Sequence, residues 1–325
     1  MLNVAVVGAT GLVGEKLVTI LAEKLPNAKL LLFANESSGK KVQAMGKTYV
    51  VEHVEKLLCT KLDVAMFMAN EQVAKTYVPP LANRGVLCVD NSSQFRMHFN
   101  VPLVVPVING NTIGKNAIVA NPNCTTIAIC TALDCIKHLG IEKVGVVTLQ
   151  SASGMGKEGL KMLESKKHTD KNHHPLCDNV LPCVGDAVGL ATSEERKILD
   201  ETNKILAIPP WKITAFCTRV PVTVGHSAVL NVELQQDVSV EQFRQCFCNK
   251  KGVLLLDDVQ NGVFPTPQII RNTALVAIGR IVKHHNGSFS LFVVEDNLLR
   301  GASQNAWEIL QIVLKNNGLW GKQDA

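Results

Sequence analysis

The stretch Val-Val-Gly-Ala-Thr-Gly-Leu-Val-Gly at residues 6–14 decides the expected fold, because it joins a strand to a helix through a glycine-rich turn. An apolar run at residues 2–7 precedes the turn, and residues 15–24 follow it with apolar side chains at helical spacing. This order of strand, glycine turn and helix is the context of a dinucleotide-binding motif. The spacing is GxxGxxG rather than GxGxxG, a variant also found in nucleotide-binding folds.

Each glycine of the motif has a physical task in such a site. Gly8 permits the tight turn, Gly11 lets the backbone approach a pyrophosphate, and Gly14 allows close packing of helix and strand. The free N–H groups of the helix N-terminus would hold the pyrophosphate. The alternative is an ordinary strand–helix turn. We expect cofactor contacts from Gly8, Thr10, Gly11, Leu12, Val13 and Gly14.

The residues after a second predicted strand, at residues 29–34, bear on the choice of cofactor. An acidic residue about 20 positions beyond the glycines often binds the ribose 2′-hydroxyl and disfavours a 2′-phosphate. Glu36 stands in that place. Ser37, Ser38 and Lys40 would instead suit a phosphate, so these residues leave NAD and NADP both open.

The pattern of elements predicts two domains. Further short apolar runs at residues 64–69 and 86–89 indicate a parallel sheet covered on both faces. The second half carries longer, more alternating strands, which are typical of a mixed or antiparallel sheet with one exposed face. We expect them at residues 215–222, 227–235, 274–283 and 288–294. An amphipathic helix at residues 303–316 should pack back on the first domain, and the main boundary falls near residues 121–123.

Composition narrows the classes of protein. The chain has 325 residues, 46% of them apolar, and its net charge of +5 is mild and scattered. We therefore expect no nucleic-acid partner, and no apolar run is long enough to cross a membrane. Without a secretory signal, ten cysteines are expected to stay reduced, and their spacing predicts no metal site.

Cys124 is the cysteine whose surroundings suggest chemistry. It stands in Asn-Pro-Asn-Cys-Thr-Thr at residues 121–126, ahead of an apolar helical stretch. Pro122 and Asn123 mark a helix start, and a helix N-terminus favours the nucleophilic thiolate. A cysteine is otherwise more often a small buried apolar residue. A dinucleotide site combined with a thiolate suggests aldehyde oxidation or acyl reduction through a thioester.

At this point the sequence resembles the aspartate-semialdehyde dehydrogenase family, and the resemblance covers nearly the whole chain. It rests on the N-terminal glycine motif, on the segment around Cys124 and on several further segments in the same order. These are residues 89–96 and 101–106, residues 150–156 (Gln-Ser-Ala-Ser-Gly-Met-Gly), residues 194–197 and 201–205, residues 219–227 (Arg-Val-Pro-Val-Thr-Val-Gly-His-Ser), and residues 296–305.

The resemblance implies a Rossmann-type parallel-sheet domain at residues 1–122 and 302–325, with an α+β catalytic and dimerisation domain at residues 123–301. It implies reductive dephosphorylation of L-aspartyl 4-phosphate to L-aspartate 4-semialdehyde, with hydride from NADPH, on the branch to lysine, threonine and methionine. It also implies a cytoplasmic homodimer or homotetramer, with the substrate and phosphate as its small-molecule partners.

Site roles follow from the same resemblance. Cys124 would be the nucleophile, His226 the general acid/base, and Gln150 would orient the acyl intermediate. Arg219 would bind the substrate carboxylate and Glu194 its ammonium, with the adjacent Glu195 as the alternative. The phosphate would be held by Arg96 and Lys197, and Ser153, Gly154 and Asn305 would lie near the cofactor together with Glu36, Ser37 and Ser38.

Three departures from the family pattern stand out. Glu36 replaces an arginine that often holds the 2′-phosphate of NADP, so NAD use is an open alternative. Met155 stands where alanine is common, and Val107 where glutamate is often found. The rival activities are N-acetyl-γ-glutamyl-phosphate reductase, which has the same thiol chemistry, and a non-catalytic dinucleotide-binding homologue. Residues 157–182 give the weakest match, and we expect a solvated loop at residues 166–174.

Overall fold

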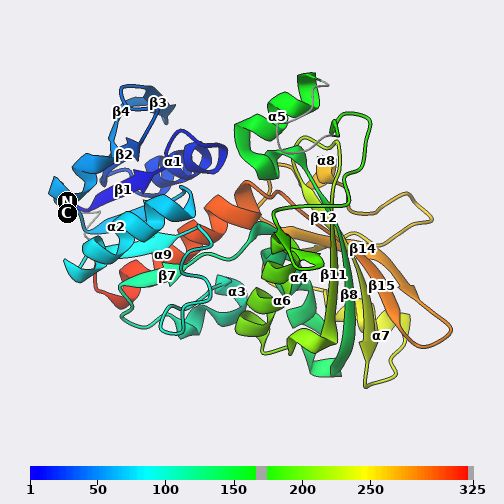
Figure 1. Cartoon of the computed structure of the whole chain (residues 1–325). Helices are drawn as coiled ribbons and strands as arrows, with labels where there is room; N and C mark the ends of the chain where they lie inside the picture. Colours follow the sequence, from blue (N-terminus) through cyan, green and yellow to red (C-terminus); the bar gives the residue numbers. More distant parts are fainter. Residues whose placement is uncertain (166–173, 321–325) are drawn as a thin grey trace. The chain divides into compact units, whose positions relative to one another are not determined.

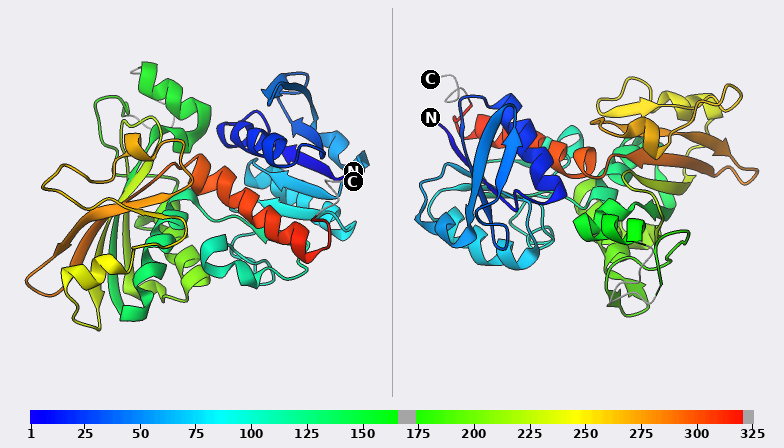
Figure 2. Two further views of the ribbon diagram at one scale, coloured as in Figure 1. Left: turned by 180° about the vertical axis from the view of Figure 1, so that it is seen from behind. Right: turned by 90° about the horizontal axis from the view of Figure 1, so that it is seen from above.

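The computed structural model of the chain describes residues 1–165 and 174–320. These residues fall into two compact units, one made of residues 1–122 and 302–320 and the other of residues 123–165 and 174–301. Most of the loop expected at residues 166–174 lies outside the described residues. Figure 1 colours the chain from the blue N-terminus to the red C-terminus, and Figure 2 gives two further views.

The first unit contains a seven-stranded sheet in the order β3-β4-β2-β1-β5-β6-β7. All neighbouring strands are parallel except β3 and β4, which form an antiparallel hairpin at one edge. This confirms the parallel sheet predicted from the apolar runs. The bounds are β1 (Asn3–Val7), β2 (Lys29–Ala34), β3 (Lys41–Ala44), β4 (Lys47–His53), β5 (Val64–Phe67), β6 (Leu87–Asp90) and β7 (Ile118–Ala120).

Helices pack on this sheet through apolar faces. They are α1 (Leu12–Lys24), α2 (Glu71–Asn83) and α9 (Asn305–Asn316), while the short helix α3 (Pro106–Asn109) contacts α9. The last helix, red in both views of Figure 2, lies beside the strands of this unit and shares one core cluster with α1. Leu310 and Leu17, both fully buried, belong to that cluster. The predicted packing of the C-terminal helix on the first domain is therefore confirmed.

Two predicted helix starts need correction. The first helix begins at Leu12, not at residue 15, because the turn is complete at Gly11, which serves as the N-cap. Leu12, Val13 and Gly14 therefore belong to the first turn of α1. The last helix begins at Asn305, because residues Leu299–Gln304 form a π-helical turn before it.

The second unit is built on a six-stranded mixed sheet in the order β11-β8-β12-β15-β14-β13. Its strands are β8 (Ile141–Gln150), β11 (Ile213–Arg219), β12 (His226–Leu234), β13 (Val253–Leu255), β14 (Val276–Lys283) and β15 (Phe289–Glu295). A small ladder pairs β9 (Ala187–Val188) with β10 (Ala191–Thr192). β8 pairs with β11 and β13 with β14 in parallel, and the other pairs of the large sheet are antiparallel, as the alternating pattern predicts.

Helices α4 (Cys124–Ile136) and α6 (Ser193–Leu206) cover one face of this sheet (Figure 1). The remaining helices are α5 (Gly156–Ser165), α7 (Val240–Gln245) and α8 (Pro267–Ile270). The opposite face of the sheet is not covered in the single chain, since Val147 and Phe216, which pair across β8 and β11, are both exposed. The predicted one-sided burial is thus confirmed. This arrangement places the start of α4 over the sheet.

The close packing at the glycine turn gives a test of stability. A Cβ atom on Gly14 would lie 2.2 Å from the carbonyl oxygen of Gly8, whereas one on Gly11 would lie 3.4 Å from it. We expect Gly14→Ala to lower the free energy of unfolding by about 1–3 kcal/mol, because the backbone must shift. Gly11→Ala is the matched control and should change it by less than about 0.5 kcal/mol. Equal losses in urea unfolding would contradict this account.

Candidate active site

Cys124 is the first residue of α4, as predicted. Asn123 caps the helix, and its Oδ1 accepts hydrogen bonds from the N–H groups of Thr125 at 2.9 Å and Thr126 at 3.3 Å. Cys124 itself is half-buried, whereas most of the helix behind it is fully buried. The buried helix therefore holds Cys124 in place, and the partly accessible thiol lies at the positive end of the helix dipole.

Three strand ends bring the other predicted residues to the same edge of the sheet. Gln150 ends β8 and Arg219 ends β11, and the two are direct partners in the parallel register. His226 begins β12, whose next residue pairs with the residue before Gln150. All three side chains are buried. Residues far apart in sequence thus meet because their strands end at one line across the sheet.

The ring of His226 has a fixed orientation. Its Nδ1 accepts a hydrogen bond from the backbone N–H of Ser151 at 3.0 Å, and the Ser151 hydroxyl lies at the same distance. Its Nε2 is buried and has no hydrogen-bond partner among the described residues. Burial, and next the charge of Arg219, lower the pKa of His226 to about 3, although Glu194 acts in the opposite direction. The ring is therefore neutral and carries its proton on Nε2.

Arg219 is the buried cation of the site. Its guanidinium donates a hydrogen bond to the carbonyl oxygen of Ser151 at 2.9 Å. Burial lowers the pKa of Arg219, while Glu194 and then Cys124 act in the opposite direction. The interaction with Cys124 places the guanidinium within electrostatic range of the thiol. Other donor hydrogens of the guanidinium fork suit it to a second anion such as a carboxylate.

Glu194, on helix α6, is hydrogen-bonded to Asn123, the residue before Cys124. Its Oε1 accepts hydrogen bonds from Asn123 Nδ2 at 2.8 Å and Gln150 Nε2 at 3.3 Å. Its Oε2 pairs with Lys197 Nζ at 3.1 Å. Burial raises the pKa of Glu194, but the charge of Lys197 and the hydrogen bonds outweigh burial, so the pKa is lowered. Glu194 is therefore an ionised carboxylate inside the site.

The neighbouring Glu195 has a different task. Its Oε2 accepts the backbone N–H of Thr192 at 2.8 Å in a capping box, and its Oε1 accepts the N–H of Cys217 at 3.0 Å. Both oxygens are thus occupied by the fold. Of the two adjacent carboxylates, Glu194 is the one that contacts the predicted site residues.

A cavity of about 630 Å³ opens beside these groups. Glu194, Lys197 and Arg219 line it together with Gly154, Met155, Leu181 and residues 183–187. A Cβ atom on Gly154 would lie 2.6 Å from a terminal nitrogen of Arg219 and 3.1 Å from His226 Nε2. Because residue 154 is a glycine, space stays open beside the Arg219 guanidinium and His226 Nε2. The size and the charged lining suit a small, zwitterionic molecule.

The glycine turn of the first unit borders a second cavity, of about 300 Å³, at the carboxyl ends of β1 and β2. Its lining includes the predicted residues Gly8, Thr10, Glu36 and Ser37, together with Asn70, which was not predicted. Gly8 has φ of +82°, and α1 begins without a side-chain cap. Free helix N–H groups next to this cavity fit the pyrophosphate of a dinucleotide. The other residues predicted to contact the cofactor in this unit are outside its lining: Gly11, Leu12, Val13, Gly14 and Ser38.

Other predicted residues lie apart from these two cavities or have partners of their own. The Arg96 guanidinium is buried and donates to the backbone oxygens of Asn121 at 3.0 Å and Asn91 at 2.8 Å. Asn305 Nδ2 donates to Val104 O and Asn121 Oδ1 at 2.9 and 2.7 Å, within the first unit. Their roles stay predictions.

Ser153 and Gly154 stand in the η4 turn (Ala152–Met155), in the second unit. Ser153 Oγ is hydrogen-bonded to the Asn297 side chain. The cofactor contacts of both residues likewise stay predictions.

Glu201 was missed from the sequence. Its Oε2 accepts the backbone N–H of Asn123 at 2.7 Å, so it holds the residue directly before Cys124. The spacing carried a signal, because Glu194 and Glu201 are seven residues apart and therefore lie on one face of α6. Both carboxylates of that face converge on Asn123.

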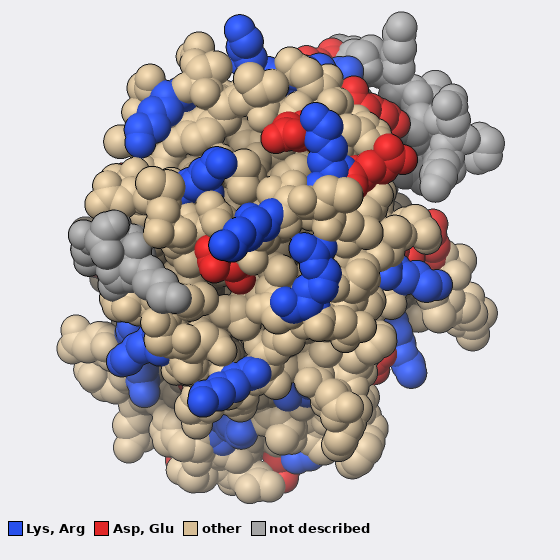
Figure 3. All heavy atoms as spheres, turned by 90° about the vertical axis from the view of Figure 1, so that its left-hand side faces the viewer, with Lys and Arg blue, Asp and Glu red and all other residues tan. Residues whose placement is uncertain are grey.

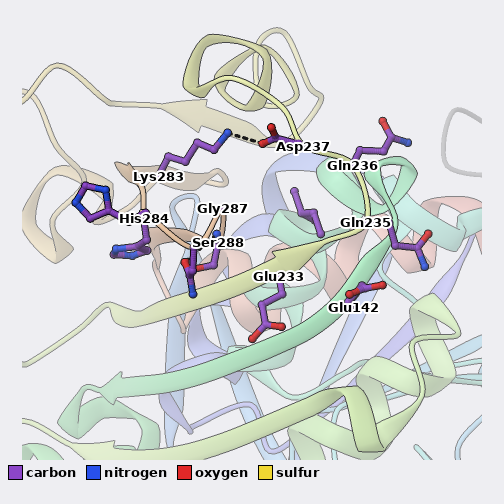
Figure 4. A pocket seen from close by; sticks show the side chains of 12 residues that line it. Glu142, Glu233, Gln235, Gln236, Asp237, Lys283, His284, Gly287 and Ser288 are labelled. Atoms are coloured by element: carbon purple, nitrogen blue, oxygen red, sulfur yellow. Dashed lines mark hydrogen bonds and ion pairs between the residues drawn. The ribbon is translucent and has the colours of Figure 1, made fainter.

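A polar pocket of about 590 Å³ near the far end of the six-stranded sheet contains none of the predicted residues (Figure 4). Two of its charged groups pair with each other, Lys283 Nζ with Asp237 Oδ1 at 2.6 Å. Within the described part of the chain, no three His, Cys, Asp or Glu side chains are grouped as a metal site needs.

Charged side chains on the face drawn in Figure 3 are interspersed rather than gathered by sign. Among the helices of residues 1–165 and 174–320, none combines the length and the apolar character needed to cross a bilayer.

Comparison with known proteins gives one consistent result. A family model described as semialdehyde dehydrogenase, NAD binding domain, matches residues 3–116, and one described as semialdehyde dehydrogenase, dimerisation domain, matches residues 135–300. Aspartate-semialdehyde dehydrogenase of Aquifex aeolicus is 36% identical, covering 96% of this chain and 98% of that protein. The Bacillus subtilis enzyme of the same name is 35% identical, covering 97% and 98%.

Solved structures agree with the sequence comparison. The crystal structure of aspartate semialdehyde dehydrogenase II from Vibrio cholerae, complexed with ASA, has a TM-score of 0.91. It is 32% identical and covers 97% of this chain and 99% of that chain. Similarity in sequence over nearly the full length, with the same fold, shows that this chain belongs to the aspartate-semialdehyde dehydrogenase family.

Proposed function

We propose that the protein converts L-aspartyl 4-phosphate to L-aspartate 4-semialdehyde through a thioester on Cys124. The observation that carries the proposal is that Glu194, which lines one cavity together with Arg219, also accepts hydrogen bonds from Gln150 and from Asn123, the residue before Cys124. His226 lies at the same edge of the sheet as Gln150 and Arg219. Arg219 would bind the α-carboxylate and Glu194 the α-ammonium, since the cavity presents one guanidinium and one carboxylate. Lys197 on the cavity wall, and Arg96 in the first unit, would hold the phosphate.

In the first half of the reaction, the Cys124 thiolate attacks the acyl carbon and phosphate leaves with the electrons of the broken C–O bond. The helix N-terminus and the nearby Arg219 charge favour the thiolate over the thiol. Gln150 would orient the acyl group, because an amide can donate and accept without titrating. The result is a thioester between Cys124 and the aspartyl side chain.

In the second half, a nicotinamide dinucleotide held at the glycine turn would supply hydride to the thioester carbon. The cavity beside the glycine turn and the uncapped start of α1 fit such a cofactor. The oxygen of the former carbonyl then gains negative charge. His226 would donate its Nε2 proton toward that oxygen and take it back as the C–S bond breaks and the aldehyde leaves. The Ser151 N–H donates to Nδ1 and so favours the tautomer with the proton on Nε2. In that tautomer Nε2 can donate a proton to the oxygen but cannot accept one from the Cys124 thiol.

We propose NADP as the cofactor, with NAD accepted as well because of Glu36. The Glu36 side chain lines the cavity at the end of β2, where a ribose hydroxyl would lie. Its carboxylate suits a 2′-hydroxyl and repels a 2′-phosphate, while Ser37 in the same lining can donate to phosphate oxygens. The balance between these two groups would set the preference.

We further propose a cytoplasmic homodimer or dimer of dimers assembled through the second unit. The match to a dimerisation-domain model over residues 135–300 supports an association there. Val147 and Phe216 are apolar, exposed and adjacent on β8 and β11, which suits them to a contact with a second copy.

The thioester mechanism is tested by phosphate-dependent oxidation of aspartate semialdehyde, followed as reduction of NADP and of NAD in parallel. We expect turnover to need phosphate and to fall by at least about 1,000-fold in Cys124→Ser, because a serine hydroxyl is a far weaker nucleophile at neutral pH. Cys59→Ser, at an exposed cysteine, is the control and should keep full activity. Turnover only with the N-acetyl-γ-glutamyl substrate would replace this function by the rival reductase, and nucleotide binding without any turnover would favour a non-catalytic role.

Cofactor preference is tested at Glu36. Glu36→Gln removes the negative charge from the cavity lining, so we expect kcat/KM with NADP to rise about tenfold relative to that with NAD. Glu23→Gln, on the exposed face of α1, is the control for a general change in charge. An unchanged ratio of the two kcat/KM values would mean that Glu36 does not contact the ribose.

The neutral state of His226 has a consequence for stability against acid. The folded pKa is about 3 and the ordinary value is 6.5, so below pH 6.5 the unfolded chain binds a proton that the folded chain does not. Stability is therefore lost as the pH falls from about 6.5 toward 3. We expect urea unfolding of His226→Asn to show a smaller slope of stability against pH, by up to about one proton. His285→Asn, at an exposed histidine, is the control, and equal slopes for the wild type and His226→Asn would refute the assignment.

A further inference from the structure

Glu295, the last residue of β15, is a carboxyl group that the proposed mechanism does not use. The residue is fully buried, and neither side-chain oxygen has a hydrogen-bond partner among the described residues. Buried carboxyl groups are normally paired or hydrogen-bonded, because burial of an unpaired charge is strongly unfavourable. A buried carboxyl group without a hydrogen-bond partner is therefore expected to be protonated and uncharged, or to have a functional role.

Its position connects it to the nucleophile. A Cβ atom on Gly301 would lie 2.7 Å from Glu295 Oε1 and 2.8 Å from Cys124 Cβ. Since both atoms are that close to one point, Glu295 Oε1 and Cys124 Cβ are at most about 5.5 Å apart. Helix α4 packs on β15, so this approach is part of the packing between the two elements. Only glycine fits between the carboxyl group and the backbone of Cys124.

The groups that face Glu295 do not neutralise it by contact. His226 is its cross-strand partner on β12, and that ring is neutral. In the turn after β15, Asp296 adds negative charge and Arg300 adds positive charge. Burial is the largest effect and raises the pKa of Glu295 well above its ordinary value, with Asp296 in the same direction and Arg300 against it.

The remaining neighbours bring no further charge. β14 places the apolar Val276 opposite Glu295, and α8, which packs on β15, consists of proline, glutamine and two isoleucines. On α4 the side chain that this geometry brings within about 5.5 Å of Glu295 Oε1, measured at its Cβ atom, is that of Cys124. The environment therefore favours a protonated carboxyl group next to that thiol.

We propose that Glu295 is a positioning residue that works as an uncharged carboxylic acid behind Cys124, and that its ionisation lowers the population of the reactive thiolate. The inference rests on the proposed role of Cys124 as nucleophile. Two negative charges within a few ångströms in a buried site disfavour each other, so an ionised Glu295 would raise the pKa of the thiol. A protonated Glu295 leaves Arg219 and the helix N-terminus as the groups that act on the thiolate.

The test is the rate at which iodoacetamide alkylates Cys124 between about pH 5 and pH 10, measured by peptide mass spectrometry. Glu295→Gln copies an uncharged carboxyl group in size and removes its titration. We expect the variant to match the wild type within about threefold at neutral pH, and to react up to about tenfold faster on the alkaline side of the wild-type midpoint. The exposed Cys59 and Cys183 in the same samples are internal controls and should react equally in both proteins.

Two results would overturn the inference. Superimposable profiles for the two proteins would mean that Glu295 does not act on the thiol. A loss of more than about 100-fold in the variant at neutral pH would mean that an ionised carboxylate is needed there. Alkylation requires no substrate, so this test is independent of the turnover test. Full turnover by Cys124→Ser would refute the proposed function, but the alkylation profiles would still report whether Glu295 acts on the thiol.

A second measurement applies if Glu295→Gln does not fold. In the wild type labelled with ¹³C at the glutamate side-chain carboxyl, NMR should show one glutamate that stays protonated at neutral pH. The label separates Glu295 from Asp90, another buried carboxyl group whose pKa burial raises. If every glutamate signal corresponds to a carboxylate at neutral pH, the inference is wrong.

Discussion

Asn123 is held from three directions, and the geometry of the proposed active site depends on this. Its Oδ1 caps α4, its Nδ2 donates to Glu194, and its backbone N–H donates to Glu201. The cap fixes the start of the helix, and the two carboxylates tie that start to α6. Because Cys124 is the next residue, the thiol has little freedom to move relative to the cavity wall. The same asparagine thus joins the nucleophile, the helix dipole and the carboxylate that is proposed to bind the substrate ammonium.

The sheet supplies the second constraint. Gln150 and Arg219 are partners in the parallel register of β8 and β11, and antiparallel pairing sets His226 beside them. A shift of register by one residue would turn these side chains to the opposite face. The exposed face carries Val147 and Phe216, whereas α4 and α6 cover the other, so the burial of one face fixes the register. Stability of the core and placement of the site residues therefore have the same physical origin.

Much of this arrangement is accessible from the sequence, and the reason differs by element. The parallel sheet and α1 follow from long apolar runs and the glycine turn, and the position of Cys124 follows from Pro122 and Asn123. The β3–β4 hairpin and α5 were not predicted, since β3 (Lys-Val-Gln-Ala) and the largely polar α5 contain no continuous apolar run such as those of the four-residue strands β5 and β6. Short elements depend on tertiary contacts that periodicity does not report. Likewise, Glu194 and Glu195 differ in their hydrogen-bond partners, since both Glu195 oxygens accept backbone N–H groups. Two adjacent glutamates cannot be distinguished in this way from the sequence.

Partners of buried charges are the part that the sequence does not reveal. Arg219 and His226 were found through a resemblance, but the neutrality of His226 follows from the Ser151 N–H and from burial, which only the three-dimensional structure provides. The same holds for Glu295, which nothing in the sequence separates from a surface glutamate. With His226 and Glu295 uncharged, neither residue adds a charge beside Cys124, whereas the Arg219 guanidinium interacts electrostatically with the thiol. The Arg219 charge and the start of α4 stabilise a thiolate more than a neutral thiol, so uncharged forms of His226 and Glu295 favour the reactive form of the nucleophile by leaving these two effects unopposed.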